Sequence, residues 1–415
     1  MTLRFLWLIE LDHRSRMRHG GNLRWFNLSR ELLRRGHQVY FAINRHPPDE
    51  LAGRRRYLEE LRQERMISGF VELDYAVPSA LGRAVNVLTH PGVVQRCLRR
   101  RRTPVVEALR SFLREHEIDV CLVSDRALLF VVPPLMRELP VVIDWVDSFV
   151  LHGVRSPFLR NPRRPLALLR TVRDLVAHIA QERYYTRRSS RSLVVSPVDK
   201  RCLDAIAGVP EKTRVLLNGV DVPAAPTGVP KEPGRLIFTG NMNFPPNYEA
   251  AIWFIDKVLP LISRRRPDVR FIVAGRNPTP ELLGRAGERV SVLGAVEDMS
   301  MEIARSALYV APLVSGGGFK NKVLEAIASG TYLTATAMAV EFLPAAIREK
   351  LLLAETTEDL AGHVLRVLDD PARYDALLPT LQQMLRDEFT WSGRAGELLD
   401  IVSGLATRRV RAQAG

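Results

Sequence analysis

Residues 316–330 read Gly-Gly-Gly-Phe-Lys-Asn-Lys-Val-Leu-Glu-Ala-Ile-Ala-Ser-Gly, a glycine loop followed by two cations and one carboxylate. The apolar residues 307–313 before it predict a strand that runs into Gly316, Gly317 and Gly318. Glycine has no Cβ, so the backbone of such a loop can approach a ligand closely. This stretch therefore predicts a strand end that contacts a ligand with its main chain.

A short helix is expected to follow the loop, from about Lys320 to Ala328, with Gly330 ending it. Its unpaired N–H groups and positive dipole end would point back at the glycines. Lys322 and Glu325 are three residues apart and so share one face of the helix. A cation for phosphate and an acceptor for ribose hydroxyls then face one ligand, which fits a nucleoside diphosphate. The alternative is a flexible turn with solvated lysines.

Other strand ends favour the binding interpretation. Gly240 follows the apolar residues 236–239, Gly275 follows another apolar run, and Val290 to Leu293 leads into Gly294. Glycines at the ends of several strands, each leading to a loop or helix, are typical of the ligand-binding edge of an open parallel sheet.

Strands and helices alternate along both halves of the chain, which predicts an α/β protein with doubly wound sheets. At 415 residues the chain exceeds one usual core, so two domains are expected. We expect a first domain over 1–215 and a proline-rich linker over 216–233. We then expect a second domain over 234–385. A C-terminal helix over 386–415 is expected to return toward the first domain.

Residues 236–344 carry a family resemblance. They contain, in order, Phe-Thr-Gly-Asn-Met-Asn-Phe-Pro-Pro-Asn, Phe-Ile-Val-Ala-Gly, Val-Leu-Gly-Ala-Val, Val-Ala-Pro-Leu and Asn-Lys-Val-Leu-Glu-Ala-Ile-Ala-Ser-Gly. This half resembles the retaining glycosyltransferases of family 4, most closely the exopolysaccharide-type branch. The resemblance implies the GT-B fold, two Rossmann-like domains facing across a cleft, and a nucleotide-sugar donor held by the second domain. The donor-binding residues that it implies are Gly20, Gly21, Asn241, Asn243, Gly316, Gly317, Gly318, Lys320, Asn321 and Glu325, with Lys322 as a catalytic cation.

The chain departs from that family in two ways. The first carboxylate of a Glu-x7-Glu pattern would fall on Gly317, so only Glu325 carries over as the ribose ligand. Many members also place Arg and Lys after the first strand of the second domain, where this chain has Asn241 and Asn243. Neutral amides supply no charge, so Lys322, with Lys320 as a second candidate, becomes the phosphate cation.

The N-terminal half offers weaker candidates. Gly20-Gly21 resembles a loop that faces the donor phosphates, and a plain strand-to-helix turn is the alternative. Asp147 falls where relatives carry a His-Asp pair, although Val146 replaces the histidine, and it is either an acceptor-side catalytic residue or a helix cap. The lesser candidates for this side of the site are Asp125, His19 and His152.

The positive charge of +14 lies entirely in the first half of the chain. Residues 1–215 hold 38 Lys and Arg against 23 Asp and Glu, a balance of +15, and the remainder carries −1. The run Arg99 to Arg102, after a partly apolar segment at 88–98, predicts contact with an anionic membrane surface, and a solvated face is the alternative. Nucleic acid is not expected, because no reading motif accompanies the charge.

Composition places further limits on the site. The three cysteines are scattered and the nine histidines show no metal-ligand spacing, so we expect a reduced cytoplasmic protein that needs neither a metal nor another cofactor. No apolar run reaches the roughly 18 residues of a membrane span.

The interpretation that unites these observations is a cytoplasmic glycosyltransferase, peripheral on the inner membrane face. It would move a sugar from a nucleotide-sugar donor to a glycan, lipid-linked or small-molecule acceptor, in bacterial polysaccharide or glycoconjugate synthesis. The alternatives are a nucleotide-binding protein without transfer activity, since the first carboxylate is missing at Gly317, and a GT-B epimerase or phosphorylase.

Overall fold

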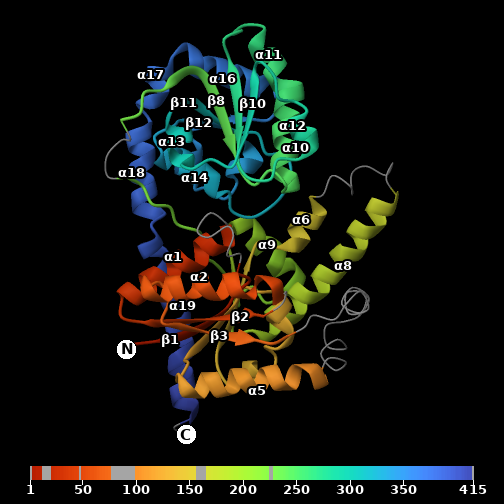
Figure 1. Ribbon diagram of the computed structural model, residues 1–415, viewed down its shortest axis with the longest axis vertical. Coiled ribbons are helices and arrows are strands. Elements are labelled where there is room, and N and C mark those ends of the chain that lie inside the picture. Colours follow the sequence, from red (N-terminus) through yellow and green to blue (C-terminus); the bar gives the residue numbers. More distant parts are fainter. Residues whose placement is uncertain are drawn as a thin grey trace. The chain divides into compact units, whose positions relative to one another are not determined.

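The computed structural model describes residues 2–11, 20–45, 48–75, 99–155, 165–223 and 228–413 (Figure 1). The chain forms two compact units. The first consists of Met1–Gly219 together with Trp391–Gly415, and the second of Val220–Thr390. The expected linker at 216–233 is thus divided between the units, and the first strand of the second unit begins inside it, at Glu232.

The first unit is built on a seven-stranded parallel sheet with the order β3-β2-β1-β4-β5-β6-β7. Strand order reverses beside β1, where parallel doubly wound sheets hold their ligands at the carboxyl ends of the strands. The strands are β1 (Arg4–Leu8), β2 (Gln38–Asn44), β3 (Gly69–Leu73), β4 (Val120–Val123), β5 (Val141–Val146), β6 (Arg191–Val194) and β7 (Thr213–Val215). The helices used below are α1 (Gly20–Arg34), α2 (Leu51–Gln63), α5 (Arg99–Glu115), α6 (Phe149–Val154), α8 (Pro165–Arg188), α9 (Pro197–Ala207) and α19 (Trp391–Gln413).

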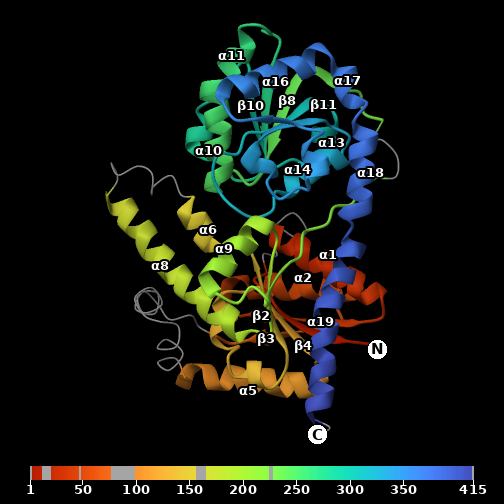
Figure 2. The same cartoon turned by 180° about the vertical axis from the view of Figure 1, so that it is seen from behind.

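Alternate residues of the β1 strand pack on opposite faces of the sheet. Phe5 and Trp7 pack with the buried residues of α1 and α19, whereas Leu6 and Leu8 pack with those of α5. Both faces of a parallel strand are therefore buried, as its continuous apolar sequence predicts. The last helix, α19, lies on the same layer as α1 and contributes Trp391, Ala395, Leu398 and Val402 to that core (Figure 2).

The second unit contains a six-stranded parallel sheet with the order β10-β9-β8-β11-β12-β13. Its strands are β8 (Glu232–Thr239), β9 (Arg270–Ala274), β10 (Val290–Gly294), β11 (Ser306–Ala311), β12 (Leu333–Thr336) and β13 (Leu352–Ala354). The helices that matter for the site are α10 (Pro245–Trp253), α14 (Asn321–Ala328) and α18 (Leu378–Glu388). Two such units confirm the predicted class, and strand order reverses here between β8 and β11, beside the predicted binding loops.

One predicted helix has different bounds in the structure, and the arginine run proves to lie on another helix. Helix α14 begins at Asn321, because Lys320 has a non-helical backbone with φ −98° and ψ 80°. Gly330, with φ +80°, ends the helix as predicted. Helix α5 begins at Arg99, so the arginine run forms its first turns, whereas the apolar segment expected at 88–98 lies outside the described residues.

Candidate functional site

The carboxyl ends of β8 and β9 meet at two glycines that have no room for side chains. Gly275 has φ +146°, and a Cβ there would lie 1.7 Å from the carbonyl oxygen of Gly240. A Cβ on Gly240 would lie 2.7 Å from Asn247 Nδ2 and 2.9 Å from Lys322 Nζ. The predicted glycines therefore let two loops and two polar side chains converge at the edge of the sheet.

The glycine loop after β11 is held by a lysine side chain. Lys320 is 7% exposed, and its Nζ donates to the carbonyl oxygens of Gly317 and Gly318 at 2.8 Å each. Glu341 Oε1 lies 3.8 Å from the same nitrogen. Gly316 and Gly318 adopt φ of +93° and +71°, values that favour glycine. Lys320 thus lies where it shapes the loop, and its positive charge faces two carbonyls.

Lys322 lies in the first turn of α14, as predicted, and is only partly exposed. Its Nζ donates to Asn247 Oδ1 at 2.5 Å and lies 4.6 Å from the centre of the Phe238 ring. Burial lowers the pKa of Lys322 to about 7. The charge of Glu325 opposes this change by favouring the protonated lysine, and the charge of Lys320 adds to it. A lysine in this state gains its full charge when an anion arrives.

Glu325 lies one turn further along the same helix face. Burial raises the pKa of its carboxyl group, and the charge of Lys322 opposes that change. The neighbouring Tyr309 hydroxyl is hydrogen-bonded to Thr239 at the end of β8, through the backbone N–H at 3.2 Å and with the side-chain oxygen at 2.8 Å. The helix thus presents one cation and one acceptor, together with its amino-terminal N–H groups, toward the glycine-lined strand ends.

The asparagines after β8 differ in their roles. Asn241 and Asn243 are exposed, and the Asn241 side chain accepts from the backbone N–H of Asn243 at 3.3 Å. Asn247 is buried on α10 and bridges the loop to the helix, because its Nδ2 also donates to the Asn241 carbonyl at 2.9 Å. Asn321 is the first residue of α14. The sequence indicated Asn247 as part of a motif, but only the fold shows that it holds Lys322.

A second contact, which the sequence did not indicate, joins α10 to the glycine loop. Ser315 Oγ donates to Glu249 Oε2 at 3.1 Å, and burial raises the pKa of the Glu249 carboxyl group. The glycine loop lacks the first glutamate of the family pattern, because Gly317 stands in its place. Glu249 therefore supplies a carboxylate near this loop from another helix.

In the first unit, Asp147 follows β5 and pairs with a histidine. Its Oδ2 lies 3.5 Å from His152 Nε2, an ion pair when the imidazole is protonated. The helix cap proposed for Asp147 is wrong, because Ser148 is the N-cap of α6 and accepts from the backbone N–H of Leu151. Val146 before it has φ +59°, a conformation that β-branched residues rarely adopt. Strain of this kind concentrates at functional sites.

The surroundings of Asp147 contain buried charges. Arg126 donates to the Asp147 carbonyl at 3.1 Å, and its guanidinium lies 3.2 Å from the centre of the Phe149 ring. Burial lowers the pKa of Arg126 to about 10. The fully buried Glu182 accepts from Ser148 Oγ at 2.8 Å and from the Phe149 N–H at 2.7 Å, so it secures the start of α6.

The remaining N-terminal candidates are placed as follows. Gly20 and Gly21 are the first residues of α1, and His19 lies outside the described residues. Asp125 is buried, accepts from the Ala127 N–H at 2.7 Å, and has its pKa raised by burial to about 6. This carboxylate holds the turn after β4.

Arg24 of α1, which the sequence did not indicate, is fully buried. Its guanidinium pairs with Asp144 at 2.8 Å and donates to the Leu216 carbonyl at 2.9 Å and to Asn218 Oδ1 at 2.8 Å. It therefore ties α1 and β5 to the last residues before the chain enters the second unit. These partners are 120 to 194 residues away, so no local pattern could show them.

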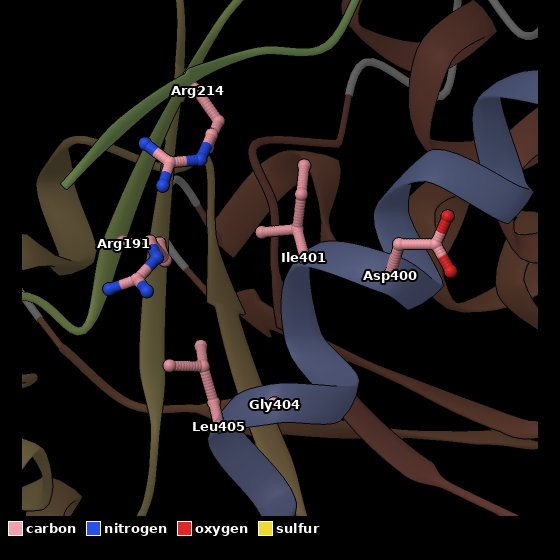
Figure 3. Close-up of a pocket in the computed structure, with 6 residues that line it drawn as sticks. All are labelled: Arg191, Arg214, Asp400, Ile401, Gly404 and Leu405. Carbon is pink, nitrogen blue, oxygen red and sulfur yellow. The ribbon is translucent and has the colours of Figure 1, made fainter. Parts of the chain in front are cut away.

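A separate hollow in the first unit has a volume of about 200 Å³ (Figure 3). It is lined by Arg191 and Arg214 of the sheet and by Asp400, Ile401, Gly404 and Leu405 of α19. None of the predicted site residues lines it. Among the described residues, no three His, Cys, Asp or Glu side chains form a group that could hold a metal ion.

Comparison with known proteins identifies the family. Residues 233–370 match the family described as glycosyl transferases group 1, and residues 19–224 match glycosyltransferase family 4. Together these regions take in most of both units. The chain belongs to the glycosyltransferases of the family 4 type, with the GT-B fold, as its motifs predicted.

Individual relatives are more distant. A phosphatidyl-myo-inositol mannosyltransferase of Mycobacterium tuberculosis is 30% identical over 193 residues, which are 43% of this chain and 47% of that protein. An uncharacterized 44.6 kDa protein from the cps region of Klebsiella pneumoniae is 24% identical over 140 residues, 32% of this chain and 36% of its own length. The chain thus matches about half, or less, of the length of these relatives.

Among solved structures, HepE of Anabaena in complex with UDP and glucose superposes with a TM-score of 0.67. The match covers 97% of this chain and 100% of that chain at 15% identity, so the likeness shows the fold.

Proposed function

We propose that this protein transfers a sugar from a nucleotide-sugar donor to an acceptor hydroxyl. The observation that carries the proposal is Lys322, partly buried with a pKa lowered to about 7, beside the glycine loop and above Glu325 on one helix face. As the sugar leaves, charge grows on the departing diphosphate. Lys322 and the amino-terminal N–H groups of α14 would stabilise that charge, and removing such a group typically costs about 10² to 10³ in rate.

The second unit would hold the nucleotide. Glu325 would accept hydrogen bonds from the ribose hydroxyls, while Gly316 to Gly318 would let the main chain approach the diphosphate. Asn241 and Asn243 are exposed beside these groups and would supply neutral hydrogen bonds to the donor. We assign Lys320 a positioning role, because its Nζ donates to two carbonyl oxygens of the glycine loop. No metal or other cofactor is part of this proposal.

The first unit would hold the acceptor, with Asp147 and His152 near its hydroxyl group. The HepE structure contains UDP and glucose, and several relatives are named for transfer to phosphatidyl-myo-inositol. Together with the +15 charge of residues 1–215, this favours a lipid-linked acceptor at the anionic inner face of a membrane. Among the described residues, no helix is long and apolar enough to cross a bilayer. Retention of anomeric configuration is proposed from the family alone.

Thermal-shift measurements with UDP, GDP, ADP and TDP would identify the base, because a ligand of the native state raises its stability by RT ln(1 + [L]/Kd). Release of nucleoside diphosphate from the matching nucleotide sugars, with and without divalent cations, then tests transfer chemistry. Lys322→Met should abolish both the shift and the release, whereas Lys257→Met, an exposed lysine of the same unit, should change neither. Lack of any nucleotide shift in the parent protein would refute the donor site.

The alternative without transfer activity rests on Gly317, where relatives have a carboxylate. It predicts tight nucleotide binding and no release of diphosphate with any nucleotide sugar or acceptor fraction. An epimerase predicts conversion of the donor without an acceptor. Chromatography of the donor pool after incubation separates the three outcomes.

A further inference from the structure

Helix α8 exposes apolar side chains along one face. Leu166, Leu169, Val172, Val176 and Ile179 are 71%, 65%, 43%, 58% and 38% exposed. They follow one another at spacings of three or four residues, so they form one stripe on the helix. The opposite face packs on the first unit, since Glu182 and Tyr185 are buried and α6 lies along the helix. We call these five residues the α8 stripe.

Arginines continue and flank the stripe. Arg183 and Arg187 follow Ile179 at spacings of four, so they share its face in the carboxyl-terminal half of the helix, and both are exposed. Arg170 and Arg173 lie four residues after Leu166 and Leu169, and they border the stripe on one side. The acidic residues of α8 are Asp174, which pairs with Arg173 at 2.8 Å, and the buried Glu182.

Figures 1 and 2 show the amino-terminal half of α8 extending beyond the strands of its unit. The exposed side chains are therefore carried outward on a projecting helix. Four of the five stripe residues lie in its outer half, where Arg170 and Arg173 border them, and Arg183 and Arg187 follow in its inner half. A helix with an apolar stripe beside basic residues is the arrangement that binds the interface of an anionic bilayer.

We propose that the α8 stripe is the surface by which this protein docks on an anionic lipid bilayer. The leucine and valine side chains would enter the boundary between headgroups and acyl chains, and the exposed arginines would face the lipid phosphates. A second copy of the chain fits less well. A parallel pairing of two α8 stripes would bring the flanking arginines of both copies together, and like charges repel.

This inference rests on the proposed function only in assuming a lipid-linked acceptor, and it can be tested apart from catalysis. The full chain is sedimented with phosphatidylcholine vesicles that contain or lack phosphatidylglycerol, at low salt and at 1 M salt. We expect binding to the anionic vesicles at low salt and much less at high salt, where screening shortens to about 3 Å. Release of diphosphate from a nucleotide sugar in detergent solution is measured in parallel, so failure of the donor site and failure of docking are distinguished.

The variant L169S/V172S/V176S removes the middle of the stripe, and because the three side chains are exposed the protein should keep its melting temperature. Partition onto anionic vesicles should fall about tenfold or more, while detergent activity stays unchanged. The matched control is L283S/L293S, which changes two exposed leucines of the second unit at 47% and 43% exposure and should bind like the parent. A variant with R173S and R187S should lose the preference for phosphatidylglycerol.

Four results would overturn the proposal. In the first, the parent protein shows no preference for anionic vesicles at low salt. In the second, the triple variant binds as well as the parent. In another, gel filtration shows that the parent is a dimer and the triple variant a monomer that still binds vesicles, which would make the stripe a self-association surface. Loss of binding only when Arg99 to Arg102 are changed to Ser would place docking on α5 and likewise exclude the α8 stripe.

Discussion

The protonation of Lys322 should make donor affinity depend on pH in a defined way. Burial lowers its pKa to about 7, so about half of the unliganded molecules lack the charge that a diphosphate requires at pH 7. A donor that binds only the charged form has its apparent affinity reduced by the competent fraction. Raising the pH from 7 to 8 lowers that fraction from about one half to about one tenth, so Kd should rise about fivefold. Lowering the pH from 7 to 6 should improve affinity less than about twofold.

The assay is isothermal titration with the nucleotide sugar that gives the largest thermal shift. A nucleotide sugar is preferred to a free nucleoside diphosphate, whose terminal phosphate itself titrates near pH 6. In buffers of different ionisation enthalpy, binding at pH 7 should take up about half a proton, because the bound phosphates restore the lysine charge. Glu325→Gln removes the neighbouring carboxyl group, whose pKa burial raises, and should leave the alkaline slope in place.

Lys322→Arg is the matched control, because a guanidinium stays charged throughout this range. Its affinity should be flat between about pH 6.5 and 8.5. An equally flat profile in the parent, or the same slope in the arginine variant, would refute the reasoning. Stability gives an independent readout: a lysine whose folded pKa lies below its unfolded value of 10.5 binds fewer protons when folded, so the free energy of unfolding should rise with pH from 7 toward 10.5. Lys322→Met should remove that rise.

Three further predictions concern the other charged groups. Glu325→Ala should weaken nucleotide binding by about 0.5 to 1.5 kcal/mol, the worth of a ribose hydrogen bond, and unchanged calorimetric affinity would remove it from the site. Asp147→Asn should lower turnover at constant nucleotide affinity and change the free energy of unfolding by less than about 0.5 kcal/mol, since Ser148 caps the helix; full activity would contradict its role. Arg24→Met should lower the free energy of unfolding by about 3 to 5 kcal/mol, because it leaves the buried carboxylate of Asp144 without its ion-pair partner. Denaturant midpoints of the two proteins measure this difference.

The sequence was sufficient to predict the architecture because its signals are local. Apolar runs that end in glycine mark strand ends of the second sheet. The Lys322–Glu325 spacing places two groups on one helix face whatever the rest of the chain does. The side-chain partners could not be predicted in this way. Lys320 and Lys322 look alike in sequence, yet one turns back to the loop carbonyls and the other reaches Asn247, 75 residues earlier. Such choices depend on which elements the fold brings together.

The discontinuous first unit decides how parts of such proteins can be exchanged by recombination. Trp391, Ala395, Leu398 and Val402 complete the core that begins with Phe5 and Trp7, so a fragment that stops before residue 391 would leave that apolar layer open to water. A chimera that borrows donor specificity from a relative should therefore receive residues 220–390 as an inserted cassette, with both flanks kept from one parent. A simple crossover near residue 220 would instead combine residues 1–219 of one parent with the last helix of the other. The two sides of that apolar core would then not match, and we expect aggregation instead of altered specificity.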